Sequence, residues 1–436
     1  MFLPEYVRNR MQALENQGFA CYAVGGCVRD ALLGLIPHDY DLCTDAMPQQ
    51  IKDIFQDHTL VLAGEKHGTV GVVTEGNVIE ITTFRTEGDY TDSRHPGWVE
   101  FVKNIEGDLS RRDFTVNAMA WSPTRGLADP FGGQQDLEHR ILRAVGNADA
   151  RFTEDALRIL RGVRFGVRFG LTPEESTLQA MFAKAPLLDN IARERVFEEL
   201  CKLLPLVTAE DLLRFAPILA QVIPELAPTM GFQQHNRHHI YDVFTHICHV
   251  TAATPPVLSL RLAALLHDIG KPGTFSWGED GQGHFYGHDR LGAQMADDIL
   301  HRLKAPTALR EEVVFLISRH MARPEADKRL LRRHLSKWGQ ERLEKLLVLQ
   351  QADLSSKGTD SEPFPFEQMQ TILAEIIAEN SCLSLRDLAV NGHDLMRLGL
   401  SGNAVGKCLN DLLGKVLDEE LPNEKSALLA EVRRTL

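Results

Sequence analysis

The stretch CYAVGGCVRDALLG (residues 21–34), followed by HDYDLCTDA (residues 38–46), decides the fold of the first part of the chain. A short apolar run ends at Gly25 and Gly26, and a helical pattern that carries Arg29 follows. Backbone N–H groups at the start of such a helix can bind phosphate oxygens. Two glycines can also form nothing more than a tight turn, so both interpretations stay open at this point.

Three carboxylates follow this turn along the chain. Asp39 and Asp41 stand two positions apart in an extended segment, so their side chains should share one face of a strand. Two carboxylates so placed can hold two Mg²⁺ ions, as phosphoryl-transfer sites do. Glu80 lies in the β-branched segment 78–83, where a carboxylate is out of place without a ligand or partner. The alternative is a solvated face on an edge strand.

The wider pattern predicts an α+β chain. Short β-like runs alternate with helical stretches from residue 19 to about residue 133, whereas apolar residues recur at helical spacing from Phe152 onward. The 436 residues exceed one domain of about 150 residues. We expect a head with a mixed sheet at residues 1–139, then an all-α neck at 140–206, an all-α body at 207–357 and a helical tail at 358–436.

Composition limits the function classes. The sequence has 47 Lys+Arg against 60 Asp+Glu, a formal net charge of −13, so a polyanionic partner must be held by a local basic surface. No apolar stretch reaches about 18 residues, which excludes a membrane span, and the start lacks the apolar region of a signal peptide. The seven cysteines form no C-x-x-C pair. We therefore expect a cytoplasmic protein without a disulfide framework.

Two arginine-rich segments are candidates for nucleotide contacts. The segment RRDFTVNA (residues 111–118) should open a helix whose Arg112, Asp113 and Asn117 serve a triphosphate or a ribose, or simply form an ion-paired helix start. The second segment, RFTEDALRILRGVRF (residues 151–165), should be one helix that carries Arg161 and Arg164 and continues to Arg168. Its arginines are the best candidate for a stripe that faces phosphates or a nucleic acid.

Within the second segment, Asp155 and Arg158 are expected as i, i+3 neighbours on this helix, with Arg195 lying against it. Asp155 only accepts hydrogen bonds and Arg158 only donates them. Cytosine and adenine each offer an N–H donor beside a ring-nitrogen acceptor, so both fit this pair, whereas uracil and guanine would meet it acceptor to acceptor and donor to donor. On spacing alone, an ordinary helical salt bridge is the better interpretation.

Histidine is concentrated between residues 235 and 320. The segment RLAALLHDIGK (residues 261–271) predicts an apolar helix that ends in His267 and Asp268, two groups that are costly to bury without a metal. Four further candidate ligands follow the order found in HD-superfamily phosphohydrolases, namely His246, His288, His320 and Asp353. The set resembles the larger ligand set of the binuclear members of that superfamily. Imidazole with carboxylate suits Mn, Fe, Ni or Zn better than Mg alone. A vestigial domain with ordinary core histidines is the alternative.

The motifs together resemble those of the bacterial class II tRNA nucleotidyltransferases, the CCA-adding enzymes. The segments that carry the resemblance are GGCVRDALLG, HDYDLCTDA, VIEITTFRTEGDYTDSRHP, RRDFTVNAMA, RFTEDALRILRGVRF, IARERVFEEL and, more weakly, NGHDLMRLGL. The resemblance implies a polymerase-β-like nucleotidyltransferase head, an HD body, the substrates CTP and ATP, and tRNA as partner. It also implies that Asp39 and Asp41 bind the catalytic Mg²⁺ ions, with Glu80 as a third carboxylate, and that Asp155 and Arg158 read the base.

The resemblance further implies a flexible loop at residues 86–96, which helps the switch from C to A addition and in which Asp92 and Arg94 are the residues to test. Three alternatives stay open. An A-adding enzyme or a poly(A) polymerase shares these motifs, an HD phosphohydrolase could use the head only for binding, and a tRNA-binding protein could lack activity altogether. The oligomeric state is left open by the sequence.

Overall fold

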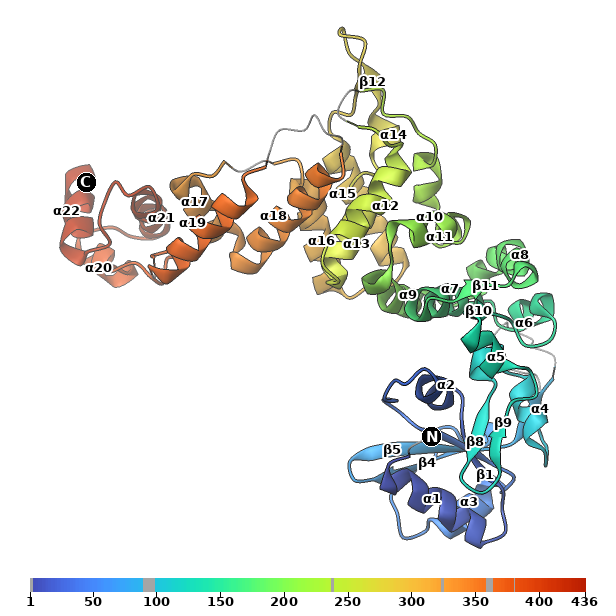
Figure 1. Ribbon diagram of the computed structural model, residues 1–436. Helices are drawn as coiled ribbons and strands as arrows, with labels where there is room; N and C mark the ends of the chain where they lie inside the picture. Colours follow the sequence, from blue (N-terminus) through green and yellow to red (C-terminus); the bar gives the residue numbers. More distant parts are fainter. Residues whose placement is uncertain (1–2, 89–98, 237–238, 323–324, 358–363, 380) are drawn as a thin grey trace. The chain divides into compact units, whose positions relative to one another are not determined.

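The computed structural model describes residues 3–88, 99–236, 239–322, 325–357, 364–379 and 381–436 (Figure 1). The chain divides into two compact units. The first comprises residues 1–207 and 214–224, and the second comprises residues 208–213 and 225–436. Mixed helix and sheet in the first unit and helices in the second agree with the predicted α+β class.

A seven-stranded mixed sheet forms the head. Its strands, in spatial order, are β3 (Leu60–Val61), β4 (Thr69–Thr74), β5 (Asn77–Thr83), β2 (Asp41–Thr44), β1 (Cys21–Val24), β8 (Ala120–Ser122) and β9 (Gly126–Ala128). Strands β2 and β5 are parallel, with Leu42 opposite Ile81, and all other neighbours are antiparallel. The helices of the head are α1 (Glu5–Asn16), α2 (Gly26–Leu32), α3 (Pro48–Ile54), α4 (Ile105–Ser110) and α5 (Gly133–Glu138).

Alternation along the strands separates a packed face from an open one. Ile79 and Ile81 of β5 are buried, whereas Val78 and Glu80, which alternate with them along the strand, are exposed. Helix α3 contacts β4 and β5, and α1 packs beside it (Figure 1). Because successive strand residues point to opposite faces, the helices cover the isoleucine face and leave the face of Glu80 open.

The segment 111–118 does not open a helix, so that prediction is wrong. Helix α4 ends at Ser110, and only a 3₁₀ turn, Thr115–Asn117, follows before β8. The Asp113 carboxylate accepts the N–H of Phe114 at 2.9 Å, and Phe114 forms a β-bridge with Ala144. These contacts hold the backbone extended where a helix would need it to turn.

The predicted loop at residues 86–96 also begins differently. Its first residues belong to β6 (Arg85–Glu87), which pairs antiparallel with β7 (Val99–Phe101). Asp92 and Arg94 lie outside the described residues. The β-branched and aromatic residues at the ends of this stretch support a strand pair that periodicity over so few residues does not reveal.

The neck is helical apart from a short parallel pair, β10 (Ile141–Leu142) with β11 (Thr172–Pro173). Its helices are α6 (Ala148–Glu154), α7 (Leu157–Phe169), α8 (Glu175–Lys184) and α9 (Arg193–Leu203), and α11 (Ala216–Val222) also belongs to the first compact unit. Asp155 and Arg158 therefore do not share one helix, contrary to prediction. Asp155 has extended dihedrals (φ −142°, ψ 102°), and its side chain accepts the N–H of Leu157 at 3.0 Å, as a residue that starts a helix does.

The second unit is built almost entirely of helices. They are α12 (Val243–Ala253), α13 (Leu258–Leu266), α14 (Lys271–Thr274), α15 (His288–Arg302), α16 (Thr307–Arg319), α17 (Lys328–Trp338), α18 (Gln340–Ser355), α19 (Phe366–Ala378), α20 (Gly392–Arg397), α21 (Asn403–Leu417) and α22 (Lys425–Thr435), with α10 (Ala209–Arg214) at the junction of the units. One hairpin departs from the all-α prediction, β12 (Ser276–Trp277) with β13 (Gly283–His284). Among the described residues, no helix has both the length and the apolar character needed to cross a bilayer.

Candidate active site and candidate metal centre

The glycine turn and the carboxylates meet because of strand pairing in the head. Strands β1 and β2 are antiparallel with Val24 opposite Asp41, so the turn that leaves β1 lies beside the start of β2. Gly25 has φ +76°, and a Cβ there would stand 2.9 Å from a guanidinium nitrogen of Arg112. The turn therefore needs glycine both for its backbone and to admit Arg112.

Asp39 and Asp41 line the same cavity, as their spacing predicts. Glu80 lies next to Asp41 on the neighbouring parallel strand, since Leu42 is opposite Ile81. The Asp41 carboxylate is open to the cavity, but the surrounding protein removes part of its hydration. This desolvation, with the charges of Glu80 and Asp39, raises the pKa of Asp41 to about 6. A set of oxygen ligands whose charges repel one another fits divalent cations such as Mg²⁺.

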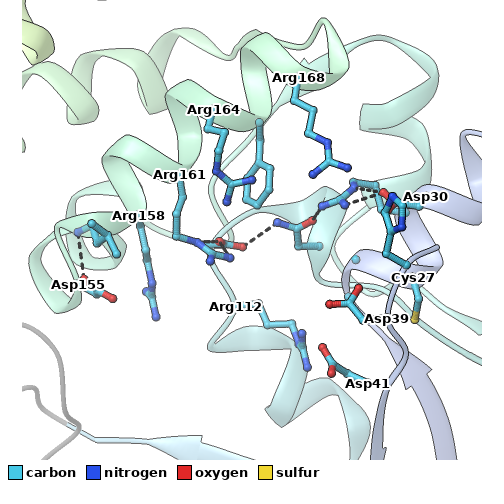
Figure 2. A pocket seen from close by; sticks show the side chains of 18 of the residues that line it. Cys27, Asp30, Asp39, Asp41, Arg112, Asp155, Arg158, Arg161, Arg164 and Arg168 are labelled. Atoms are coloured by element: carbon cyan, nitrogen blue, oxygen red, sulfur yellow. Dashed lines mark hydrogen bonds and ion pairs between the residues drawn. The ribbon is translucent and has the colours of Figure 1, made fainter. Parts of the chain in front are cut away.

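The cavity has a volume of about 520 Å³ and continues from these carboxylates to α7 (Figure 2). Eight arginines and five aspartates are among its lining residues, so cations outnumber anions there although the whole chain is acidic. It is lined by every head and neck residue that the sequence analysis proposes for nucleotide contact, namely Gly25, Gly26, Arg29, Arg112, Asp113, Asn117, Asp155, Arg158, Arg161 and Arg164. Glu80 is not among the lining residues.

Asp113 organises the middle of this cavity. Arg161 Nε donates to Asp113 Oδ2 at 2.7 Å, Asn117 Nδ2 donates to its Oδ1 at 3.1 Å, and Arg29 donates to Asn117 Oδ1 at 2.5 Å. Burial alone would raise the pKa of Asp113, but the Arg161 charge and the Asn117 hydrogen bond outweigh it and lower the pKa to about 2. The carboxylate is thus a fixed anion that orients its neighbours.

Asp155 and Arg158 both reach the cavity (Figure 2), and each is held by partners other than the other. Arg195 donates to Asp155 Oδ2 at 3.0 Å, so Arg195 lies where the sequence analysis expects it. Arg158 donates to Glu154 Oε2 at 2.6 Å and to the carbonyl oxygen of Arg111 at 3.1 Å. An acceptor and a donor are therefore presented side by side without pairing to each other, as a hydrogen-bonding edge for a base requires.

Aromatic rings of α7 and a distant acid hold two arginines of this cavity, Arg29 of α2 and Arg164 of α7, and neither contact was predicted from the sequence. The Arg29 guanidinium stands 4.2 Å from the ring centroid of Phe169, and that of Arg164 stands 4.4 Å from the centroid of Phe165. Arg164 Nε also donates to Glu199 of α9 at 2.6 Å. Phenylalanine interleaved with arginine in RGVRFGVRF was an available signal for the stacking. No local pattern indicated Glu199.

The six residues predicted for a metal centre in the body do come together. They belong to α12, α15 and α18 and to the turns after α13 and α16. Asp268 is central: His246 Nε2 lies 3.5 Å and His267 Nε2 3.1 Å from its Oδ2, while His288 Nε2 lies 3.4 Å and His320 Nε2 3.9 Å from its Oδ1. Asp353 Oδ1 lies 3.0 Å from His246 Nε2.

Three of these imidazoles are fixed in the same way. Nδ1 of His267, of His288 and of His320 each lies 2.7 Å from the carbonyl oxygen three residues earlier, and would donate to it. The lone pair of each Nε2 then points inward, and the two facing Nε2 atoms of His288 and His320 are only 3.2 Å apart. His267 Nε2 is buried without a hydrogen-bond partner. Such lone pairs fit a bound cation.

The centre divides into two groups that share Asp268. His246, His267 and Asp268 form one, and Asp268, His288 and His320 form the other; in each group the ligand atoms lie within 4.8 Å of one another. A carboxylate shared between two nitrogen-rich groups fits a pair of transition-metal ions. The sequence analysis missed two lysines here: Lys271 Nζ lies 2.7 Å from Asp268 Oδ2, and Lys357 Nζ lies 2.8 Å from Asp353 Oδ2.

Three family descriptions match successive parts of the chain. Residues 21–143 match the Poly A polymerase head domain, residues 170–230 match the probable RNA and SrmB-binding site of polymerase A, and residues 237–358 match the HD domain. The first range includes the head carboxylates and the third includes the six residues of the candidate metal centre, whereas Asp155 and the arginines of α7 fall between the first two ranges.

Individual relatives extend the match. The chain is 46% identical over 219 residues to the CCA-adding enzyme of Geobacillus thermodenitrificans, an alignment that spans about half of each chain (50% and 51%). It is 33% identical over 440 residues to the CCA-adding enzyme of Latilactobacillus sakei, covering 98% of both chains. The crystal structure of the Bacillus stearothermophilus CCA-adding enzyme in complex with CTP matches with a TM-score of 0.74 at 29% identity, covering 100% of this chain and 99% of that one. The chain therefore belongs to the family of CCA-adding enzymes.

Proposed function

We propose that this protein builds or repairs the 3′-terminal CCA of tRNA from CTP and ATP, with release of pyrophosphate. One observation carries the proposal: a single cavity joins the carboxylates of Asp39 and Asp41 to a wall of arginines and to the edge formed by Asp155 and Arg158. Relatives named CCA-adding enzymes support it, one of them along 98% of both chains.

The carboxylates and the arginines have separate tasks in this proposal. Asp39 and Asp41, with Glu80 beside them, would hold two Mg²⁺ ions, which polarise the attacking hydroxyl and offset charge on the leaving phosphates. Arg29, Arg112 and Arg161 would bind the triphosphate, braced by Asp113. The tRNA 3′-oxygen bonds to the α-phosphorus, the bond to the bridging oxygen breaks, pyrophosphate leaves, and the hydroxyl proton is released to water.

Base choice would rest on Asp155 and Arg158 without a nucleic-acid template. The Asp155 carboxylate accepts from the exocyclic amino group of cytosine or adenine, and Arg158 donates to the adjacent ring nitrogen. Uracil or guanine would leave buried polar groups unpaired, at a cost of about 1–3 kcal/mol for each group. Arg195, which holds Asp155 at 3.0 Å, would keep the acceptor in position.

The remaining assignments complete the proposal. The head, neck, HD body and tail would span residues 1–139, 140–206, 207–357 and 358–436, and Asp92 with Arg94 would act in the switch from C to A addition. The partner would be tRNA, held partly by the arginines of α7, and the protein would act in the cytoplasm.

The test is a sequential extension assay on tRNA that ends before CCA. With CTP alone, we expect two nucleotides to be added, and subsequent ATP should add one more. An A-adding enzyme or a poly(A) polymerase would leave this substrate unextended by CTP. A tRNA-binding protein without activity would release no pyrophosphate with any nucleotide.

We propose a second activity for the body, metal-dependent hydrolysis of phosphate esters. The two ligand groups that share Asp268 support it. The six residues would hold metals of the Mn, Fe, Ni or Zn type, which would supply an activated water. In the hydrolysis, a water oxygen bonds to phosphorus, the ester P–O bond breaks, and the proton given up by the water passes to the leaving oxygen, which departs as an alcohol. Release of inorganic phosphate from 2′-phosphates and ring opening of 2′,3′-cyclic phosphates, each assayed with added Mn²⁺, Ni²⁺ or Zn²⁺, test this proposal.

A further inference from the structure

A second cavity, of about 370 Å³, opens onto the metal centre of the body. Asp268, His288, His320 and Asp353 of the centre form one side of it. The segment 283–286, which includes the end of the β12–β13 hairpin, contributes to another. A cavity of this size admits a small organic phosphate together with the group to which it is esterified.

Tyr286 stands out on the hairpin side. It is 78% exposed although it lines the cavity, and its ring lies nearly parallel to that of His284, with an interplanar angle of 7° and a centroid distance of 5.2 Å. Phe285 between them packs on Phe275 and Phe232, at centroid distances of 5.6 and 6.4 Å. Phe285 thus anchors the segment, and the two flanking rings are left to form a separate stack.

Positive charge lies on the side of the metal centre. Lys271 Nζ is 2.7 Å from Asp268 Oδ2 and 2.8 Å from Gln234 Oε1, and Lys357 Nζ is 2.8 Å from Asp353 Oδ2. Both lysines line the cavity, and Lys271 is 4% exposed. An anionic phosphoryl group is therefore favoured at this end. An exposed ring favours an uncharged planar group at the other.

We propose that Tyr286, backed by His284, is a stacking platform that selects phosphate esters carrying a planar aromatic ring, such as a nucleobase, for the metal centre. The proposal rests on the phosphohydrolase activity proposed above and adds the residues that choose its substrate. The ring of the substrate stacks on Tyr286 while its phosphoryl group lies between the metal ligands and the two lysines. A phosphate ester without a ring would contact only the end of the cavity that holds the metal ligands and the two lysines.

The experiment compares two substrates on the full chain with Mn²⁺, adenosine 2′-phosphate and the ring-free glycerol 2-phosphate. Tyr286→Ala should lower kcat/KM for adenosine 2′-phosphate about tenfold, mainly through KM, because base stacking on an aromatic side chain has about this strength. Hydrolysis of glycerol 2-phosphate should stay within twofold. Tyr286→Phe keeps the ring and should behave as the parent protein.

Trp277→Ala is the matched control, since Trp277 is an aromatic residue of the same hairpin, is 61% exposed, and is not among the residues that line the cavity. The Trp277→Ala variant should leave kcat/KM unchanged for both substrates. Unchanged kinetics of Tyr286→Ala, or an equal loss on both substrates, would overturn the platform.

Calorimetry with adenosine 2′-phosphate in EDTA separates this proposal from the phosphohydrolase activity. The head is the same in parent and variant, so a difference in Kd arises at Tyr286. We expect Tyr286→Ala to weaken binding about tenfold even without metal. Hydrolysis of neither substrate by the parent protein would refute the activity, whereas equal binding by parent and variant would refute the platform.

Discussion

The carboxylates of the head and those of the body form two candidate metal sites that are built in opposite ways. In the head, Asp39 and Asp41 are neighbours in sequence, Glu80 is added by one parallel strand pairing, and the ligands are oxygen only. In the body, Asp268 and Asp353 are buried among imidazoles that come from widely separated helices. The arrangement in the head is determined mainly by residues close together in the sequence. The arrangement in the body forms only when its helices pack against one another.

The two candidate sites also differ in the electrostatics of their central carboxylates. Like charges nearby, together with desolvation, raise the pKa of Asp41 to about 6. Burial alone would raise the pKa of Asp268 as well, but His267 and Lys271 together lower it well below its usual range. The repulsion between the head carboxylates is therefore only partly offset by Arg112 and would be relieved by an incoming cation, whereas the body carries its own positive partners in Lys271 and Lys357. This difference predicts that the two centres can be inactivated separately.

Removal of a head carboxylate should have the largest effect. Asp41→Ala should lower nucleotide incorporation about 1,000-fold or more, since it removes a ligand needed only for the chemical step. Affinity for tRNA, measured by filter binding, should stay within twofold, and phosphate release by the body should be unaffected. Near-normal turnover would rule out Asp41 as a metal ligand.

The reciprocal change is His267→Ala in the body. It should weaken retention of Mn²⁺ or Ni²⁺ about 10- to 100-fold, measured by metal analysis after dialysis, and abolish phosphohydrolase activity. Nucleotide addition should remain within twofold. His301→Ala, a histidine of α15 exposed to solvent, serves as the control. Loss of both activities in His267→Ala would mean that the body does not act as an independent catalyst.

A smaller effect is expected on base choice within the head. Arg158→Ala removes the donor but leaves Asp155 held by Arg195. The ratio of CTP to UTP incorporation should fall about 10- to 100-fold, which corresponds to the loss of one or two polar contacts. Lys184→Ala, a cation of the neck that is not among the residues lining the cavity, should keep the parental ratio. An unchanged ratio in Arg158→Ala would contradict base reading by this residue.

The smallest effect concerns stability. Ionised Asp113, with a pKa lowered to about 2 from 3.8, contributes stability that is fully present above pH 3.8 and is lost as the pH falls through 2. Asp113→Asn should therefore lower the free energy of unfolding by about 2 kcal/mol at pH 7. Urea unfolding of the full chain, parent and variant, between pH 7 and pH 3 measures this difference in the free energy of unfolding. The difference from the parent should be constant above about pH 5 and shrink below pH 3.8; a difference that grows on acidification would refute the assignment.

The same comparison explains what could be predicted from the sequence. The spacing of Asp39 and Asp41 was sufficient to find the head carboxylates, because strand periodicity fixes their common face. His267 and Asp268 were found at the end of an apolar helix, and the other four body residues through their resemblance in order to HD-superfamily phosphohydrolases, because their convergence depends on helix packing. The helix break at Asp155 was not predictable from periodicity, because one side-chain hydrogen bond to Leu157 decides it.

Other features depend on contacts that no local pattern indicates. Glu199, which holds Arg164, is 35 residues away along the chain. The turn at residues 111–118 was mistaken for a helix start because its bridge to Ala144 is a tertiary contact. In the sequence, Tyr286 looks like any aromatic residue in a polar loop. Only the structure shows that Phe285 packs on Phe275 and that His284 and Tyr286 line the cavity.

The central claim is that side chains of α7 and its preceding turn take the place of a template base. Crystal structures of the full chain with CTP and with ATP test it most directly. We expect the amino group of either base within hydrogen-bonding distance of Asp155, the adjacent ring nitrogen within reach of Arg158, and the phosphates among the arginines. Bases seated away from these two residues, with the triphosphate still bound, would contradict the account.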